Sequence, residues 1–255
     1  ERQRQREFHQ AVIEERRACC GRPMLSKGLV NDARKVAKRN VGLLAPYARA
    51  GIPIIGTEPS CVLTFRDEYL DLLPNDPDAK AVSENSFMID EFLAKLEHEG
   101  ELGITWSSDK PDVFFHGHCH QKALVGMSAS MAILKSAGCT ASESGAGCCG
   151  MAGSFGYEAE HYDVSRKIGE ERLFPAVNAT KADTAIAVAG VSCRQQIEHF
   201  TGRKTQHIAE VLARRIAPGH VWKPKSVEMP VEVVPTEEVE AKFEHAEKSA
   251  TSSTS

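Results

Sequence analysis

The residues of this chain best suited to chemistry are its eight cysteines, most of which stand in two repeated groups. Each group begins with an adjacent pair followed by glycine, Cys19-Cys20-Gly21 in the first and Cys148-Cys149-Gly150 in the second. A single cysteine follows each pair: Cys61 lies 41 residues after Cys20, and Cys193 lies 44 residues after Cys149. Thiolates act as nucleophiles, as redox groups and as ligands for soft metals. The repetition predicts two halves of similar construction that share one such chemistry.

The second group holds one more cysteine than the first. Cys119 precedes its pair, so this half offers four thiols: Cys119, Cys148, Cys149 and Cys193. Four thiolates suit an iron–sulfur cluster. Adjacent cysteines are awkward ligands for one tetrahedral zinc ion, whereas the several irons of a cluster offer separate sites, so the pair favours iron. Five glycines between residues 145 and 156 provide bare amides that can stabilise anionic sulfur.

Strand-like and helix-like segments alternate along the chain, and the cysteines follow the strand-like ones. Short runs rich in apolar residues predict strands at 52–55, 112–115, 139–143 and 184–189. Apolar residues at helical spacing predict helices over 28–50, 62–73, 82–96, 124–136 and 157–177. This alternation favours an α/β fold with parallel sheets, in which ligands bind beyond the carboxyl ends of the strands. We therefore expect the cysteine loops to lie at those ends.

The repeat also predicts the domain organisation. We expect two repeated parallel-sheet α/β halves, the first over residues 1–105 and the second over 106–216. The first half has no counterpart of Cys119, so it is incomplete at its N-terminal end, where the charged segment 1–17 is interpreted as a helix leading into a short strand. Residues 217–255 are rich in Pro, Glu, Lys, Ser and Thr. That composition buries too little apolar surface to fold, and it predicts a disordered tail.

The bulk composition excludes several classes of protein. A net charge of −4 with only four Tyr and two Trp gives no basic surface or stacking platform for nucleic acid. No apolar run approaches the roughly 20 residues that span a bilayer. The first 17 residues lack the apolar centre of a secretory signal, so a cytoplasmic location is the default expectation. In such a chain, cysteines indicate metal binding or catalysis rather than disulfides.

Some of these motifs also admit other interpretations. Gly145–Gly150 fits the G-x-G-x-x-G pattern of dinucleotide sites, but the acidic residues about 20 positions further on lie in a predicted helix, so this interpretation is rejected. Cys139 lies outside both groups and is interpreted as a small buried hydrophobe. Three histidines surround Cys119, and they suit zinc ligation, hydrogen bonding to cluster sulfur, proton transfer or strand capping: His116, His118 and His120.

With these motifs in view, the chain resembles the cysteine-rich CCG-domain family. That family includes the B subunit of heterodisulfide reductase, glycolate oxidase iron–sulfur subunits, the C subunit of anaerobic glycerol-3-phosphate dehydrogenase, and the C-terminal iron–sulfur part of FAD-linked dehydrogenases of the D-lactate or glycolate type. The segments that resemble the family are Cys19-Cys20-Gly21-Arg22-Pro23, Glu58-Pro59-Ser60-Cys61, residues 116–122, residues 144–157 and Ser192-Cys193-Arg194-Gln195-Gln196.

The resemblance implies a set of cluster ligands. Four cysteines would hold an iron–sulfur cluster of the 4Fe-4S type, and three would be their partners in the first repeat: Cys119, Cys148, Cys149 and Cys193, with Cys19, Cys20 and Cys61. It also implies an oxidoreductase in which an FAD-binding dehydrogenase domain or subunit oxidises a 2-hydroxy acid. This chain would then bind no FAD itself, transfer electrons to an acceptor that the sequence does not identify, and be inactive alone.

Two functions of other classes compete with this one. The first is a zinc-stabilised structural or docking domain, in which one metal ion is bound by Cys119, Cys193, one member of the Cys148–Cys149 pair and a histidine. The second is a thiol–disulfide enzyme that uses Cys148 and Cys149 as a redox pair, and it predicts reactive thiols without bound metal.

Overall fold

The computed structural model describes residues 11–220, and within that range the chain forms two compact units. Unit 1 comprises the chain up to Ile54 together with Thr64–Ser86, and unit 2 comprises Ile55–Leu63 and the chain from Phe87 onward. The predictions for residues 1–10 and 221–255, which include most of the predicted tail, lie outside the described residues.

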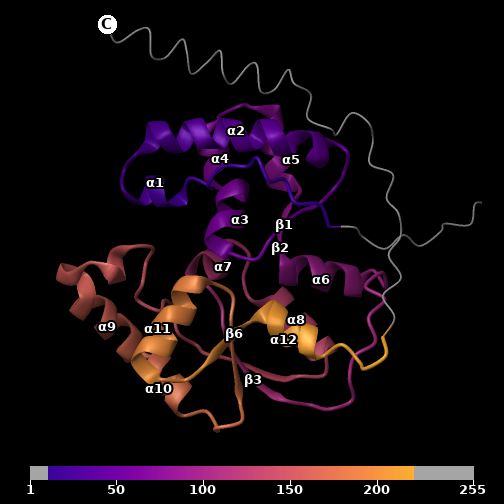
Figure 1. The fold of residues 1–255 in the computed structure, drawn as a ribbon, viewed down its shortest axis with the longest axis vertical. Coiled ribbons are helices and arrows are strands. Elements are labelled where there is room, and N and C mark those ends of the chain that lie inside the picture. Colours follow the sequence, from indigo (N-terminus) through magenta and orange to yellow (C-terminus); the bar gives the residue numbers. More distant parts are fainter. Residues whose placement is uncertain (1–10, 221–255) are drawn as a thin grey trace, which may run out of the picture. The chain divides into compact units, whose positions relative to one another are not determined.

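Unit 1 is mainly helical and is built around one long helix, α2 (Val30–Arg49). This helix contacts three shorter ones, α1 (Arg22–Ser26), α4 (Glu68–Leu72) and α5 (Pro77–Glu84). The buried side of α2 is lined by small residues at helical spacing, such as Ala33 and Ala37, which pack in one core with the fully buried Tyr69. The helix predicted over residues 28–50 is confirmed (Figure 1).

Two short strands, β1 (Ile54–Gly56) and β2 (Ser86–Met88), pair as a small sheet. After β1 the chain enters α3 (Pro59–Arg66). The single helix predicted over residues 82–96 is wrong, because α5 ends at Glu84 and the extended β2 separates it from α6 (Ile89–His98). The Glu91 side chain accepts the Met88 backbone N–H and so caps α6.

Unit 2 contains a four-stranded sheet in which every strand is parallel to its neighbours. The strands are β3 (Asp112–His116), β4 (Thr140–Glu143), β5 (Ala185–Val188) and β6 (Thr205–His207). Their order is β4-β3-β5-β6. Val113 of β3 pairs with Ala141 on one side and with Ala185 on the other. A parallel sheet with intervening helices confirms the predicted α/β class.

The connections between these strands are helical. The helices and 3-10 turns of the region are α7 (Cys119–Leu124), α8 (Ser128–Ser136), η1 (Phe155–Tyr157), η2 (Ala159–His161), α9 (Tyr162–Glu171), α10 (Leu173–Asn178), α11 (Val191–Thr201) and α12 (Ile208–Arg214). The long helix predicted over 157–177 is interrupted at Arg172, between α9 and α10. Pro175 lies in the first turn of α10, where an amide N–H has no intrahelical partner to lose. No helix within residues 11–220 is long and apolar enough to cross a membrane.

Helices cover both faces of the parallel sheet, as Figure 1 shows. Val113 and Phe115 of β3 belong to a core that they share with α6, α8 and α12. Phe114, between them, belongs to the opposite core, with α10 and α11. Side chains alternate between faces along a strand, so His116 lies on the same face as Phe114.

The strand order creates a switch point at the carboxyl ends of β3 and β5. The chain leaves β3 for α7 and α8, and α8 packs on one face, whereas it leaves β5 for α11 on the opposite face. Connections that diverge from neighbouring parallel strands open a crevice, and α/β proteins bind ligands there. The cysteine loops after β3, β4 and β5 all end at this edge.

Candidate metal centre

Four cysteine side chains come together at the carboxyl edge of the parallel sheet in unit 2. Cys119 opens α7, Cys148 and Cys149 lie in the loop after β4, and Cys193 is the third residue of α11. Their thiols form a chain of hydrogen bonds that runs from Cys119 through the adjacent pair to Cys193. The structure therefore juxtaposes the four thiols that the sequence singled out, and their role as ligands stays a prediction.

The hydrogen bonds couple the protonation of these thiols. Hydrogen bonds from neighbouring thiols lower the pKa of Cys148 and of Cys193. The same hydrogen bonds, together with burial, raise the pKa of Cys119 and of Cys149. The thiolate is the metal-binding form of cysteine. A thiolate in this site is thus stabilised by the thiols beside it.

Lys122 places a positive charge beside this site. Its ammonium hydrogen-bonds to the carbonyl of Ala146, in the loop that leads to the cysteine pair. Burial lowers the pKa of Lys122. Attraction to the sulfurs of Cys193, Cys119 and Cys148 raises this pKa, but it offsets only part of the effect of burial. A half-buried cation of this kind balances the charge of several thiolates in a low-dielectric environment.

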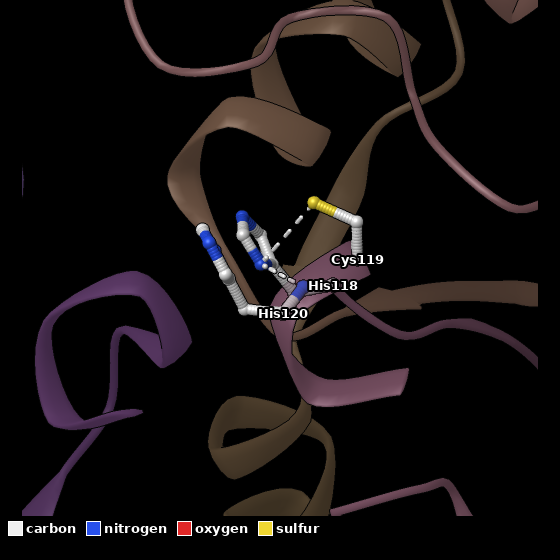
Figure 2. A group of neighbouring side chains, drawn as sticks. All are labelled: His118, Cys119 and His120. Atoms are coloured by element: carbon white, nitrogen blue, oxygen red, sulfur yellow. Dashed lines mark hydrogen bonds between the residues drawn. The ribbon is translucent and has the colours of Figure 1, made fainter. Parts of the chain in front are cut away.

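His118, Cys119 and His120 form a second group of potential ligands, drawn in Figure 2. One ligand atom of each lies within 4.8 Å of those of the other two. However, Nδ1 of His118 accepts the backbone N–H of His120 at 3.2 Å and so caps α7. A metal ion on this nitrogen would displace the cap. The same nitrogen also lies 3.8 Å from Cys119 Sγ, so the His118 ring contacts both the start of α7 and the sulfur that this helix presents.

A buried polar network fixes α7, which presents Cys119. The Gln121 side chain accepts the His118 backbone N–H at 3.3 Å and donates to Ser130 Oγ at 2.6 Å. Ser130 and Gln121 both donate to one oxygen of Asp90, and all three side chains are buried. Burial raises the pKa of Asp90. The position of the Cys119 loop thus depends on polar groups of α6 and α8.

Replacing Asp90 by asparagine is expected to change how stability depends on pH. Because burial raises the pKa of Asp90 above its ordinary 3.8 in the folded chain, the folded state binds this proton more tightly than the unfolded state. The parent should lose stability as pH rises from 3.8 through the raised pKa, and Asp90→Asn should lack that loss. Urea unfolding from about pH 4 to about pH 7 measures the difference.

The exposed Asp183 supplies a matched control for this experiment. Asp183→Asn should follow the parent at every pH. A difference in stability between Asp90→Asn and the parent that does not vary with pH would show that the Asp90 carboxyl keeps its ordinary pKa.

The loop that carries the cysteine pair is locked by its backbone. Gly150 has φ +95°, and a Cβ there would lie 2.1 Å from the carbonyl oxygen of Ser165 in α9. Ser165 Oγ donates to the Gly150 carbonyl at 2.8 Å, and Gln196 of α11 donates to the Cys149 carbonyl at 2.9 Å. The pair is thereby held between α9 and α11, which explains why glycine follows the cysteines.

The first cysteine group repeats several of these features. Gly21 adopts φ +90°, close to the value at Gly150, and packs against α2. Cys19 is exposed and Cys20 is buried, both in unit 1. Cys61 belongs to unit 2 and is the third residue of the helix after β1, as Cys193 is after β5. The repeat seen in the sequence is therefore also a repeat of local structure.

Two further residues of unit 2, Glu58 and Cys139, have roles that their contacts define. Glu58, which begins the Glu58-Pro59-Ser60-Cys61 motif, accepts the backbone N–H of Val191 at 2.9 Å. A carboxylate is favourable at a helix N-terminus, so Glu58 anchors the helix that presents Cys193. Cys139 is buried in the apolar core with α8, where burial raises the pKa of its thiol. Its interpretation as a small hydrophobe is confirmed.

These features define an α/β protein with a four-cysteine centre at the carboxyl ends of its strands. The chain belongs to the Cysteine-rich domain family, CCG, which it matches over residues 3–66 and 113–198. One Cys-Cys-Gly motif lies in each matched segment. The resemblance inferred from the cysteine motifs is thereby confirmed.

The chain is also similar to parts of several curated proteins. It is 28% identical over 201 residues to the C subunit of anaerobic glycerol-3-phosphate dehydrogenase from Escherichia coli K12, covering 78% of this chain and 50% of that protein. It is 31% identical over 195 residues to D-2-hydroxyglutarate dehydrogenase of the same strain, covering 75% and 18%. It is 27% identical over 210 residues to lactate utilization protein A of Bacillus subtilis, covering 77% and 83%.

The chain thus spans half or less of the length of the first two relatives. No solved structure matches it significantly.

Proposed function

We propose that this chain binds an iron–sulfur cluster and transfers electrons for a flavin-dependent dehydrogenase that oxidises a 2-hydroxy acid. The observation that supports the cluster is the meeting of four thiols from three loops at one edge of the sheet: Cys119, Cys148, Cys149 and Cys193. Two of the relatives are named as dehydrogenases. One of them is named for D-2-hydroxyglutarate, and a third relative is named for lactate. Both compounds are 2-hydroxy acids.

The number and adjacency of the thiols favour a cluster over a single ion. The four cysteines come from three loops, and two of them, Cys148 and Cys149, are neighbours in the chain. Adjacent cysteines are awkward ligands for one tetrahedral zinc ion, whereas the several irons of a cluster offer separate sites. Four thiolates suit the 4Fe-4S type.

When bound, an iron–sulfur cluster accepts and releases electrons over a range of potentials that its surroundings set. The residues of this chain would hold it and tune it. The cysteines supply the thiolates, the Lys122 ammonium balances their charge, and the two apolar cores around Phe114 and Phe115 restrict water. The FAD would be bound by a separate dehydrogenase domain or subunit.

Several finer assignments accompany this proposal. Residues 1–105 and 106–216 would be the two repeats. Cys19, Cys20 and Cys61 would serve the first repeat as the four cysteines of the metal centre serve the second. A cytoplasmic location would suit a chain whose function needs reduced thiols.

The proposal is tested by metal analysis of protein purified without oxygen. The parent is expected to contain iron and acid-labile sulfide and to absorb visible light. The variant Cys148→Ser, Cys149→Ser should contain neither, because serine is a poor ligand for the soft iron sites of a cluster. A colourless parent with about one zinc per chain would instead support the docking domain. A metal-free parent with reactive thiols would support the thiol–disulfide enzyme.

A further inference from the structure

His116 is a buried histidine that lies beside two of the four cysteines of the candidate cluster site. It is the last residue of β3, it pairs with Val188 of β5, and its side chain is fully buried. Its ring lies beside the sulfurs of Cys193 and Cys148 and helps to lower the pKa of both thiols. A buried imidazole at this edge of the sheet therefore faces anionic sulfur.

Ser144 is the hydrogen-bond partner of one ring nitrogen of His116. Ser144 Oγ lies 2.8 Å from His116 Nδ1, and it accepts the backbone N–H of Ala146 at 3.3 Å. The amide uses one lone pair of the hydroxyl and leaves its proton available for donation to Nδ1. The tautomer in which Nδ1 accepts carries its ring proton on Nε2.

In that tautomer Nε2–H is a buried donor that needs an acceptor. Among residues 11–220, Nε2 of His116 is a buried nitrogen that lacks a hydrogen bond of good geometry, and the sulfur of Cys193 lies beside the ring. Buried donors without a partner are costly and rare in folded proteins. The acceptor that this position offers is sulfur, and a group rich in sulfur, bound among the four cysteines, would supply it.

We propose that His116 donates a hydrogen bond from Nε2 to sulfur of the bound cluster and thereby raises its reduction potential, with the Ser144 hydroxyl donating to Nδ1 of the same ring. This inference rests on the proposed function. Reduction adds negative charge to the cluster, so a donor aimed at its sulfur stabilises the reduced form more than the oxidised form. The hydrogen bond is strong because it is buried and its acceptor is charged.

Two substitutions at one position separate the hydrogen bond from the volume of the ring. His116→Phe keeps a ring and removes the donor, whereas His116→Gln keeps an N–H donor near the place of Nε2. Redox titration followed by EPR should show His116→Phe shifted to lower potential by at least 59 mV, which is a tenfold change in the one-electron equilibrium. His116→Gln should shift by less than half of this. His98→Gln, in α6 outside the cysteine site, is the matched control and should not shift.

Iron and sulfide content measured on the same samples distinguishes the two ways of failing. A parent without iron overturns the proposed function. A parent and a His116→Phe variant that both hold iron and have the same potential overturn the hydrogen bond and leave the proposed function standing.

A second measurement does not depend on whether His116→Phe folds. Pulsed EPR on the reduced parent labelled with isotopic histidine nitrogen should show a weakly coupled nitrogen, and His116→Gln should lose that coupling while keeping its iron. A coupling that persists unchanged in His116→Gln would assign it to another histidine and overturn the proposal.

Discussion

Gly150→Ala should prevent the chain from holding iron and should destabilise unit 2 by about 2–5 kcal/mol, a sum of backbone strain and overpacking. The backbone at Gly150 has φ +95°, which costs an L-residue about 1–2 kcal/mol. The added Cβ would also lie 2.1 Å from the Ser165 carbonyl oxygen, so the loop or α9 must move. Either movement displaces Cys148 and Cys149 from Cys193.

Gly147→Ala is the matched control for this substitution, three residues earlier in the same loop. Gly147 does not have a positive φ, and a Cβ there would meet no atom within 4 Å. Its alanine variant should keep the iron content of the parent and its stability to within about 0.5 kcal/mol. Urea unfolding and iron analysis of the three proteins provide the check. Parent-like values for Gly150→Ala would show that the loop is not rigid.

Apolar strands were predictable from the sequence because their signal is local. The runs at 112–115 and 184–189 form β3 and β5, since β-branched and aromatic residues suit a sheet that is buried on both faces. The alternation of strands and helices was then enough to predict the α/β class. The strand order was not predictable, because it depends on which connection packs on which face.

Helix α11 was not predicted because its buried side carries few apolar side chains. Its buried residues are Cys193, Gln196 and Ile197, of which only the last gives a hydrophobic signal. Gln196 is buried because it hydrogen-bonds to the Cys149 carbonyl, from a loop distant in sequence. A helix of this kind shows no helical spacing of apolar residues, because its buried side contacts the site through polar side chains and cysteine.

The cysteine set was predictable and most of its supporting residues were not. The repeat identified the four thiols because residue types and spacings can be read directly from the sequence. Glu58 and Val191 are far apart in the chain, so their contact exists only once β1 and β5 are in place. The contact between His116 and Ser144 likewise follows from the register that pairs Phe115 with Glu143 on neighbouring strands.

Cys193→Ser should lose nearly all the iron and sulfide of the parent, whereas Cys139→Ser should keep both. The two cysteines form a matched pair, because both are buried in unit 2, with 1% and 7% of their surface exposed. Each substitution buries a hydroxyl in place of a thiol, which costs about 1–3 kcal/mol. Loss of stability should therefore be similar in the two variants, and only the content of iron and sulfide should separate them.

The reason for this difference is the position of each sulfur relative to the other thiols. Cys193 lies at one end of the hydrogen-bonded chain of four thiols and beside His116, whereas Cys139 precedes β4 and packs among apolar side chains of α8 and its neighbours. Iron and sulfide analysis with urea unfolding of both variants makes the comparison. Equal retention of iron by the two would remove Cys193 from the ligands and would require a fourth ligand other than cysteine, for which His116, beside the sulfurs of Cys193 and Cys148, is a candidate.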